Sequence, residues 1–279
     1  MILQFIDDDP LLIFLVVRII IKKKFSKYII MTYTPFEIRV FPLLIFYVVL
    51  SISFTFMTVK MIIKWRERKV LPPLYLSIVF TLFTIAIITL AIGLGEAAIT
   101  GFYKEIYRFS LPFGYSMVII ADILLFTFGN DVTDKGRKGL IPVIIIGAII
   151  VIFIYLPWNW WGVPPEDYEG QLNLRLYTTL SLVLYSYFIY IYIFIICRRA
   201  MNKTVDEITH LGLSLLSYSM ICLILFFLMF IGDTVLIVVF DHPGYSEFVY
   251  FAWIFAFIFF IVSYLSLVMP NWLVKRIRK

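Results

Sequence analysis

The sequence is poor in charged residues and in the residues of catalytic and metal chemistry. Charged side chains make up 15% of its 279 residues, whereas a soluble domain carries about 25%. Its 2 histidines, His210 and His242, fall at opposite ends of the apolar segment that separates them, which argues against a histidine-based metal site. Its 2 cysteines, Cys197 and Cys222, lie in or at the end of apolar segments, so no extracellular disulfide is expected.

Motifs of known catalytic chemistry are also missing. No GxSxG, Walker loop, HExxH or CxxC occurs in the chain. A membrane protease of the paired-aspartate type needs two acids at one depth. At a rise of about 1.5 Å per residue, Asp122 and Asp233 are about 10 Å or more apart along the membrane normal. The sequence therefore predicts a protein that is not an enzyme.

Apolar residues are what the sequence has in abundance, at 62% of the chain with 28 Phe and 18 Tyr. A membrane-spanning helix needs about 20 mostly apolar residues. Seven segments qualify: 41–63, 74–95, 110–129, 140–157, 176–197, 211–235 and 248–269. The runs are continuous rather than alternating, which excludes a transmembrane strand barrel. The prediction is an all-α integral membrane protein, a seven-transmembrane helix bundle in a lipid bilayer, with no sign of nucleic-acid binding.

The positions of lysine and arginine predict the orientation of this bundle. The loop KWRERK, the loop NDVTDKGRKG, the loop RRAMNK and the tail KRIRK are basic, whereas the alternate loops hold only Lys104, Arg108 and Arg175. Basic loops stay on the cytoplasmic side. We therefore expect the amino terminus outside, the carboxyl terminus in the cytoplasm and a multi-pass location in the cell membrane. Tryptophans agree with this orientation, since they concentrate at both interfaces: Trp158, Trp160 and Trp161 outside, Trp65 and Trp272 inside.

The first 40 residues are interpreted as an amino-terminal extension. Their apolar run PLLIFLVVRIII is too short for a span, contains Arg18, and as an eighth span would place KWRERK outside. Met31 is a plausible start of the native protein, and an interfacial amphipathic segment within residues 1–30 is the alternative. Residues 41–272 form the predicted membrane domain, and residues 273–279 form a short basic cytoplasmic tail.

Two acids, Glu96 and Asp233, are predicted at the outer end of the bundle. Glu96 follows Leu74 by 22 residues, and Asp233 follows Leu211 by 22 residues, a rise of roughly 33 Å in each case. One interpretation pairs each acid with an outer base, Lys104, Arg108 or Arg175, to lock the rim. The other interpretation is an outward-facing polar pocket for a small polar or cationic ligand. Its predicted walls are Glu96, Arg108 and Asp233, and its predicted lid is Trp160 or Trp161.

Asp122 is the most deeply placed acid of the chain. It follows Ser110 by 12 residues, which places it roughly 18 Å into a core about 30 Å thick. A carboxyl group at this depth is either protonated or hydrogen-bonded to a neighbouring helix. The segment 176–197 offers the hydroxyls of Tyr185, Tyr187, Tyr190 and Tyr192. Asp122 with Tyr185 and Tyr192 is thus either a structural hydrogen-bonded group or a proton or ion relay or switch.

Small residues surround Glu96. The backbone of a second helix can approach closely at glycines, here Gly93, Gly95 and Gly101. If helices touch there, Glu96 lies in a rigid frame rather than in a loop.

Seven spans with an outer amino terminus follow the general plan of rhodopsins and G-protein-coupled receptors, but the diagnostic residues are missing. The last span has no lysine for a retinal Schiff base, so no cofactor is expected, and neither the Asp/Glu-Arg-Tyr nor the Asn-Pro-x-x-Tyr motif occurs. YLSLVMPNWLVKRIRK, residues 264–279, resembles the end of the seven-helix sensor domains of prokaryotic, especially archaeal, histidine kinases. No kinase domain follows in this chain. The resemblance implies signalling through a separate cytoplasmic partner, and the Ile, Lys and aromatic content suits an AT-rich prokaryote such as an archaeon.

These features favour a stand-alone seven-helix sensor or receptor-like protein that binds a small ligand in the outer pocket and relays to a cytoplasmic partner. Two alternatives stay open: a proton- or cation-coupled transporter that uses Asp122, and a non-catalytic membrane scaffold. A cavity that touches Glu96 or Asp233 distinguishes the sensor from the scaffold.

Overall fold

The computed structural model describes residues 33–69, 71–133, 139–163, 167, 170–242 and 244–277. Contacts divide the chain into two units, Met1–Tyr33 and Thr34–Lys279, and the fold below is that of the second. The expectations for residues 1–30, including the start at Met31, lie outside the described residues.

The second unit is built from helices. They are α2 (Phe41–Arg68), α3 (Leu71–Thr100), α4 (Glu105–Val132), α5 (Leu140–Ile154), α6 (Arg175–Met201), α7 (Glu207–Phe240), α8 (Glu247–Val268) and α9 (Asn271–Ile277), with the short 3-10 turns η1 (Ile38–Val40) and η2 (Pro157–Asn159). Extended pairing among the described residues is limited to an isolated bridge between Pro35 and Phe102. The predicted all-α class is confirmed for this part of the chain.

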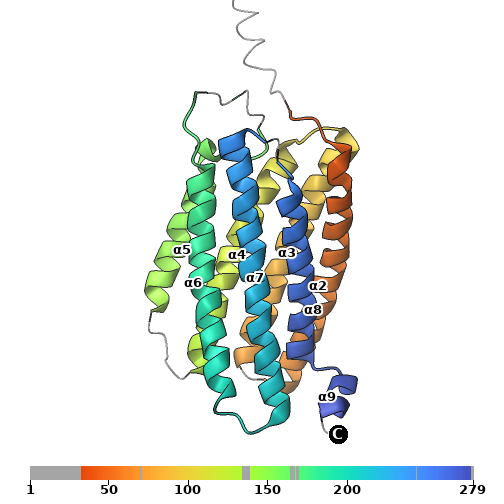
Figure 1. Ribbon diagram of the computed structural model, residues 1–279, viewed down its shortest axis with the longest axis vertical. Helices are drawn as coiled ribbons and strands as arrows, with labels where there is room; N and C mark the ends of the chain where they lie inside the picture. The colour runs from red at the N-terminus through yellow and green to blue at the C-terminus, as the bar shows by residue number, and fades with distance from the viewer. Residues whose placement is uncertain are drawn as a thin grey trace, which may run out of the picture. The chain divides into compact units, whose positions relative to one another are not determined.

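Successive helices from α2 to α8 run in alternating directions (Figure 1). We call the end where α2, α4, α6 and α8 begin the upper end, drawn at the top of Figure 1, and the opposite end, which carries α9, the lower end. Helices adjacent in sequence pack together, and α2 also packs against α8, while α4 packs against α6. The contacts between α2 and α8 join the first and last long helices of the bundle, and α5 lies against α4 and α6.

Six of these helices are long and apolar enough to cross a membrane: those within 38–67, 73–100, 105–132, 175–201, 207–240 and 247–268. The protein is therefore a helical, multi-pass membrane protein by the length and composition of its helices. The predicted span 140–157 is a shorter apolar helix, since α5 has 15 residues, or about 22 Å at 1.5 Å per residue. It ends at Ile154, before the turn η2 that begins at Pro157.

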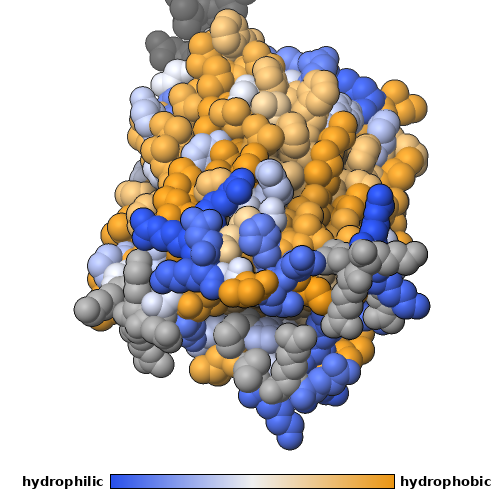
Figure 2. Space-filling view, turned by 60° about the horizontal axis from the view of Figure 1, so that its bottom comes forward, coloured by the Kyte–Doolittle hydropathy of each residue, from blue (hydrophilic) through white to orange (hydrophobic). Residues whose placement is uncertain are grey.

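The surface of the bundle agrees with contact to lipid. Apolar residues cover its sides in Figure 2, whereas hydrophilic residues gather toward the lower end, which is turned to the viewer. On α5, Ile141 and Ile152 are 70% and 63% exposed. Isoleucines exposed to this degree along a helix have a favourable environment in hydrocarbon, not in water.

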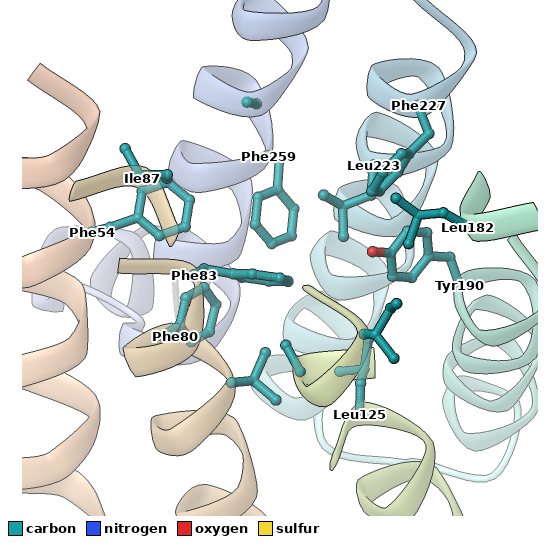
Figure 3. Close-up of a cluster of buried hydrophobic side chains, with 14 of the residues drawn as sticks. Phe54, Phe80, Phe83, Ile87, Leu125, Leu182, Tyr190, Leu223, Phe227 and Phe259 are labelled. Atoms are coloured by element: carbon teal, nitrogen blue, oxygen red, sulfur yellow. The ribbon is translucent and has the colours of Figure 1, made fainter. Parts of the chain in front are cut away.

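Aromatic rings fill the interior. Phe54 of α2, Phe83 of α3 and Phe259 of α8 lie together, with ring centroids 6.1–6.4 Å apart. Figure 3 shows them with Tyr190 of α6, whose hydroxyl points toward the same cluster. Offset and edge-to-face ring pairs at these distances are favourable. The bundle is thus held in part by large rings, whose irregular packing leaves the cavities described below.

Gly93 lies where α3 and α4 approach most tightly in this region. A Cβ atom at Gly93 would be 2.4 Å from Oγ of Ser110 and 3.0 Å from the backbone of Tyr107. At Gly95 and Gly101 a Cβ atom would meet nothing within 4 Å. The predicted close approach is confirmed for Gly93, and Gly101 instead has a positive φ of 75° in the turn after α3, a conformation that glycine adopts without strain.

We predict that Gly93→Ala destabilises the protein and that Gly95→Ala, two residues along the same helix, does not. The added methyl group at position 93 must push α4 away, an overpacking effect that costs about 1–3 kcal/mol. The free energy of unfolding in mild detergent measures both variants. Equal stability of the two would show that α3 and α4 do not pack closely at Gly93.

Candidate functional site

A cavity of ≈ 100 Å³ lies at the upper end of the bundle and is called the upper chamber. Its lining is rich in polar side chains. The polar and aromatic residues are Thr34, Tyr47, Tyr103, Tyr107, Tyr115, Arg175, Phe230, Asp233, Thr234, His242 and Tyr245. This is the kind of pocket that the sequence predicts at the outer end, and Asp233 is the predicted residue that lines it.

Asp233 is a buried carboxylate of α7, 6% exposed. Its Oδ1 accepts hydrogen bonds from the backbone N–H and from Oγ of Ser246, at 3.0 and 2.8 Å. Ser246 is the residue that precedes α8, so the carboxylate lies at the positive end of that helix. Its Oδ2 receives no hydrogen bond from any residue that the structure describes. One oxygen therefore joins α7 to α8, and the other remains open to a ligand.

Arg175 supplies the opposite charge. It begins α6 and its guanidinium lies over the ring of Trp161, 5.2 Å from the ring centre. Its Nε is buried and has no hydrogen-bond partner among the described residues. Arg175 and Asp233 both line the chamber, yet within the described ranges they form no ion pair with each other. Two opposite charges thus face one small cavity without neutralising each other.

Phenol groups form the rest of the polar wall. The hydroxyls of Tyr107 and Tyr245 are hydrogen-bonded to each other, and the ring of Tyr103 lies 4.5 Å from that of Tyr107 and 6.0 Å from that of Tyr245. Burial raises the pKa of Tyr103 and Tyr245, the two that lie outside the long helices. Both phenols therefore stay protonated at neutral pH and are available as hydrogen-bond donors.

Residues 34–36 cover one side of the upper chamber. Phe36 donates its backbone N–H to the carbonyl of Gly101 at 2.8 Å, and Tyr103 donates to the carbonyl of Thr34 at 3.0 Å. These bonds place Thr34 in the chamber wall. The segment just before η1 is therefore part of the site.

A second cavity of ≈ 90 Å³, the inner chamber, lies deeper in the bundle. Tyr47, Leu111, Tyr115 and Phe230 line both chambers, so the two adjoin. Most of the other lining residues are apolar or aromatic: Phe54, Phe83, Ala86, Ile87, Leu90, Gly114, Val118, Tyr190, Leu223, Phe226, Phe227, Trp253, Ala256 and Phe259. Oη of Tyr190 and Nε1 of Trp253 are buried and make no hydrogen bond to the residues described.

Glu96 does not line the upper chamber; its role is to cap α4. Its Oε2 accepts the backbone N–H of Tyr107 at 3.1 Å, in the first turn of that helix. A carboxylate at this position satisfies one of the N–H groups that a helix leaves unpaired and lies at the positive end of the helix dipole. Glu96 therefore acts on the site indirectly, by fixing the helix that carries Tyr107 and Tyr115.

The other predicted wall and lid residues hold the loop that follows α5. Nε of Arg108 donates to the carbonyl of Gly162 at 3.2 Å, and Nε1 of Trp160 donates to that of Leu172 at 3.0 Å. Trp161 is buried, with its Nε1 bonded to the carbonyl of Ile154 at 2.9 Å. It lies behind the chamber, 5.5 Å from the ring of Tyr115. None of the three lines the cavity, and Asp233 is bonded to Ser246 rather than to Arg108.

The tyrosines of the upper chamber are the residues that the sequence interpretation missed. Tyr107 and Tyr115 are eight residues apart on α4, a spacing that places them on one face of a helix. This spacing was the sequence feature that could have indicated a shared site, although it is equally typical of aromatic residues that only pack in the interior. Arg175 was named only as a possible partner of the rim acids.

Asp122 is fully buried and hydrogen-bonded to α6, as expected for an acid at that depth. The donor is Ser186, whose Oγ lies 2.7 Å from Oδ2. Tyr185 donates instead to the carbonyl of Val143 at 3.1 Å, and Tyr192 to Oδ1 of Asn130 at 2.6 Å. The three predicted relay residues therefore form no chain of hydrogen bonds, and Asp122 lines neither chamber.

Taken together, the fold and the chambers define a helical multi-pass membrane protein with a polar cavity at one end. Among the described residues, no group of three histidine, cysteine, aspartate or glutamate side chains is placed to hold a metal ion. The chain matches no model of a known protein family, no curated protein and no solved structure. The resemblance to histidine-kinase sensor domains therefore stays a hypothesis.

We predict that Ser186→Ala lowers the free energy of unfolding by about 0.6–1.7 kcal/mol, the range of side-chain hydrogen bonds between membrane helices. The substitution leaves the carboxyl of Asp122 without its donor. In an Asp122→Ala background the same change should have little effect, which a double-mutant cycle measures. Ser181→Ala is the matched control, because that exposed serine bonds only to Tyr177 of its own helix. An equal loss in both backgrounds would contradict the Asp122 pairing.

Proposed function

We propose that this chain is a seven-helix membrane sensor that binds a small ligand in the upper chamber and relays the binding to a cytoplasmic partner. The observation that carries the proposal is the pair of charges, Asp233 and Arg175, that line one cavity without pairing. Charged groups that are partly removed from water and lack a partner are unfavourable. A ligand that satisfies them supplies the missing interactions and stabilises one arrangement of the surrounding helices.

The distribution of basic residues supports an outward-facing upper chamber. Lysines and arginines collect where helices meet the lower end: Lys60, Lys64, Arg66, Lys69, Arg198, Arg199, Lys203, Lys275 and Arg276. By the positive-inside rule, this distribution supports a lower end that faces the cytoplasm. In this proposal α5 is the seventh span, because it connects the lower to the upper end of the bundle (Figure 1).

The relay is proposed to run through α7 and α8, which border cavities at both ends. At the lower end a cavity of ≈ 680 Å³ is lined in part by Gly212 of α7, Ser266 of α8 and Val274 of α9. Oγ of Ser266 donates to the carbonyl of Gly212 at 2.7 Å. Nζ of Lys64 donates to the last carbonyls of α8, those of Leu267 and Val268, at 2.7 Å each. A movement of α8 at the upper chamber would change these contacts, and a partner in the lower cavity would sense the change.

The two alternative functions are less well supported. A transporter that uses Asp122 needs water to reach that carboxyl, but Asp122 lines neither chamber and is hydrogen-bonded to Ser186. A scaffold needs no cavity at its polar residues, whereas Asp233 lines one.

Thiol labelling tests whether the upper chamber opens to the outside. In a background with Cys197→Ala and Cys222→Ala, we predict that Thr234→Cys reacts with a membrane-impermeant quaternary-ammonium methanethiosulfonate added to intact cells. Thr234 lines the chamber and is adjacent in sequence to Asp233, whose carboxylate attracts a cation. Labelling is followed by mass spectrometry.

Thr84→Cys is the control in the same background. Thr84 is also buried, but it is hydrogen-bonded to Thr58 at 3.0 Å and lines neither chamber. It should react far more slowly. No difference between positions 234 and 84, or labelling of position 234 only from the cytoplasmic side, would refute an outward-facing site.

Hydrogen exchange tests the relay separately. We predict that the ammonium adduct at Thr234→Cys raises amide exchange in residues 264–277, because an occupied chamber displaces the start of α8 and weakens the contacts at its end. Exchange in α3 and α4 should change less, and a smaller methyl adduct at the same position is the control. Unchanged exchange at the lower end would reject the relay while leaving the binding site intact.

A further inference from the structure

We propose that the ligand is a small zwitterion of the amino-acid type with an aromatic side chain. Its ammonium group pairs with Asp233, its carboxylate pairs with Arg175, and its ring enters the inner chamber. This inference rests on the proposed function, since it names the class of ligand that the upper chamber takes.

The two unpaired charges select the head group. Asp233 keeps Oδ2 without a protein partner, and the guanidinium of Arg175, which lies over Trp161, makes no hydrogen bond or ion pair with the described residues. A cation would satisfy only the aspartate, and an anion only the arginine, so either would leave one of the two charges unpaired. A zwitterion satisfies both at once, and its own net charge of zero adds none to the cavity.

The phenols around these charges complete the recognition of a compact head. Tyr107 and Tyr245 bond to each other through their hydroxyls, and each oxygen can still accept or donate one further hydrogen bond. They line the same cavity as the two charged residues. An α-amino carboxylate, with its charged groups one carbon apart, is small enough for a cavity of ≈ 100 Å³.

The inner chamber selects the side chain. Leu111, Tyr115 and Phe230 border both chambers, so a group attached to the head continues directly into the inner one. There it meets the ring cluster of Figure 3, in which Phe54, Phe83 and Phe259 lie together. Aromatic groups pack well against such walls in offset and edge-to-face arrangements.

The size of the inner chamber sets the limit on that side chain. An apolar cavity of about 150 Å³ is known to bind benzene, and the inner chamber measures ≈ 90 Å³. The inner chamber is the smaller of the two, so a single ring enters only if the lining rings shift, and there is no room for the acyl chain of a lipid. Tyr190, which is fully buried, lies at its wall on α6. The ligand is thus a single-ring amino acid rather than a lipid.

Binding of radiolabelled L-phenylalanine to the purified protein in lipid nanodiscs tests this inference. Three competitors each lack one recognised group: phenethylamine lacks the carboxylate, 3-phenylpropanoate lacks the ammonium group, and L-alanine lacks the ring. L-Phenylalanine should bind, and loss of either charged group should weaken binding on the order of 30-fold or more, as expected when one partner of a buried charge pair is removed. Loss of the ring should weaken it on the order of tenfold or more.

Two substitutions in the upper chamber give opposite patterns. Asp233→Asn keeps an oxygen for Ser246 and should weaken L-phenylalanine and phenethylamine while sparing 3-phenylpropanoate. Arg175→Gln should weaken L-phenylalanine and 3-phenylpropanoate while sparing phenethylamine. Unchanged L-phenylalanine binding in both variants would overturn the proposal.

The inner chamber is tested with a matched pair at Gly114. A Cβ atom there would lie 3.7 Å from Leu90, an ordinary contact, so Gly114→Ala should bind L-phenylalanine almost normally. Gly114→Leu fills the chamber and should weaken binding on the order of tenfold or more. Equal binding by the two variants would count against the ring position.

The labelling experiment at Thr234→Cys separates failure of this inference from failure of the proposed function. If position 234 is accessible from outside but L-phenylalanine binds no better than L-alanine, the ligand class is wrong and the outer site stands. If position 234 is inaccessible, both proposals fail.

Discussion

The carboxylate of Asp233 is the group on which the upper end of the bundle depends. A charged side chain within a membrane helix costs about 2.5–3.5 kcal/mol at the bilayer centre and less toward the interface. Two hydrogen bonds from Ser246 at the start of α8 offset this cost. They also bring the end of α7 close to the beginning of α8. Because Tyr245 precedes Ser246, the same contact orients Tyr245 toward Tyr107 and so builds the chamber wall.

The chamber persists because rigid elements surround it. Glu96 caps α4, Trp161 packs behind Tyr115, and residues 34–36 are bonded to the turn at Gly101. The contacts of Glu96 and of residues 34–36 satisfy polar groups that would otherwise be unpaired, and the contact of Trp161 with Tyr115 is a favourable ring pair. Asp233 of α7 and Arg175 of α6 line this chamber from two different helices.

The sequence predicted the parts of this structure that depend on distance along a helix. Long apolar runs predicted the helices, and counting residues placed Asp233 at one end of the bundle and Asp122 in its interior. Partners were harder to predict because they depend on the rotation of each helix and on loop geometry. Ser246 follows a turn in which Asp241 and Tyr245 both have positive φ. The periodicity of apolar residues does not predict the backbone conformation of such a turn. Glu96 was predicted either to pair with a base or to line the pocket, and it instead accepts a backbone N–H, a partner that the sequence pattern does not identify.

Asp122 illustrates the same limit and shows why the two buried acids differ. Its neighbour α6 presents several tyrosines, yet the donor at 2.7 Å is the short side chain of Ser186, while Tyr185 donates to the carbonyl of Val143. Asp122 has one neutral donor, Ser186, and its Oδ1 is buried without a hydrogen-bond partner among the described residues, whereas Asp233 shares a cavity with a cation. Burial alone thus does not mark a functional carboxylate. A carboxylate that shares a cavity with an unpaired opposite charge is the better candidate, because there a ligand can lower the free energy of both groups at once.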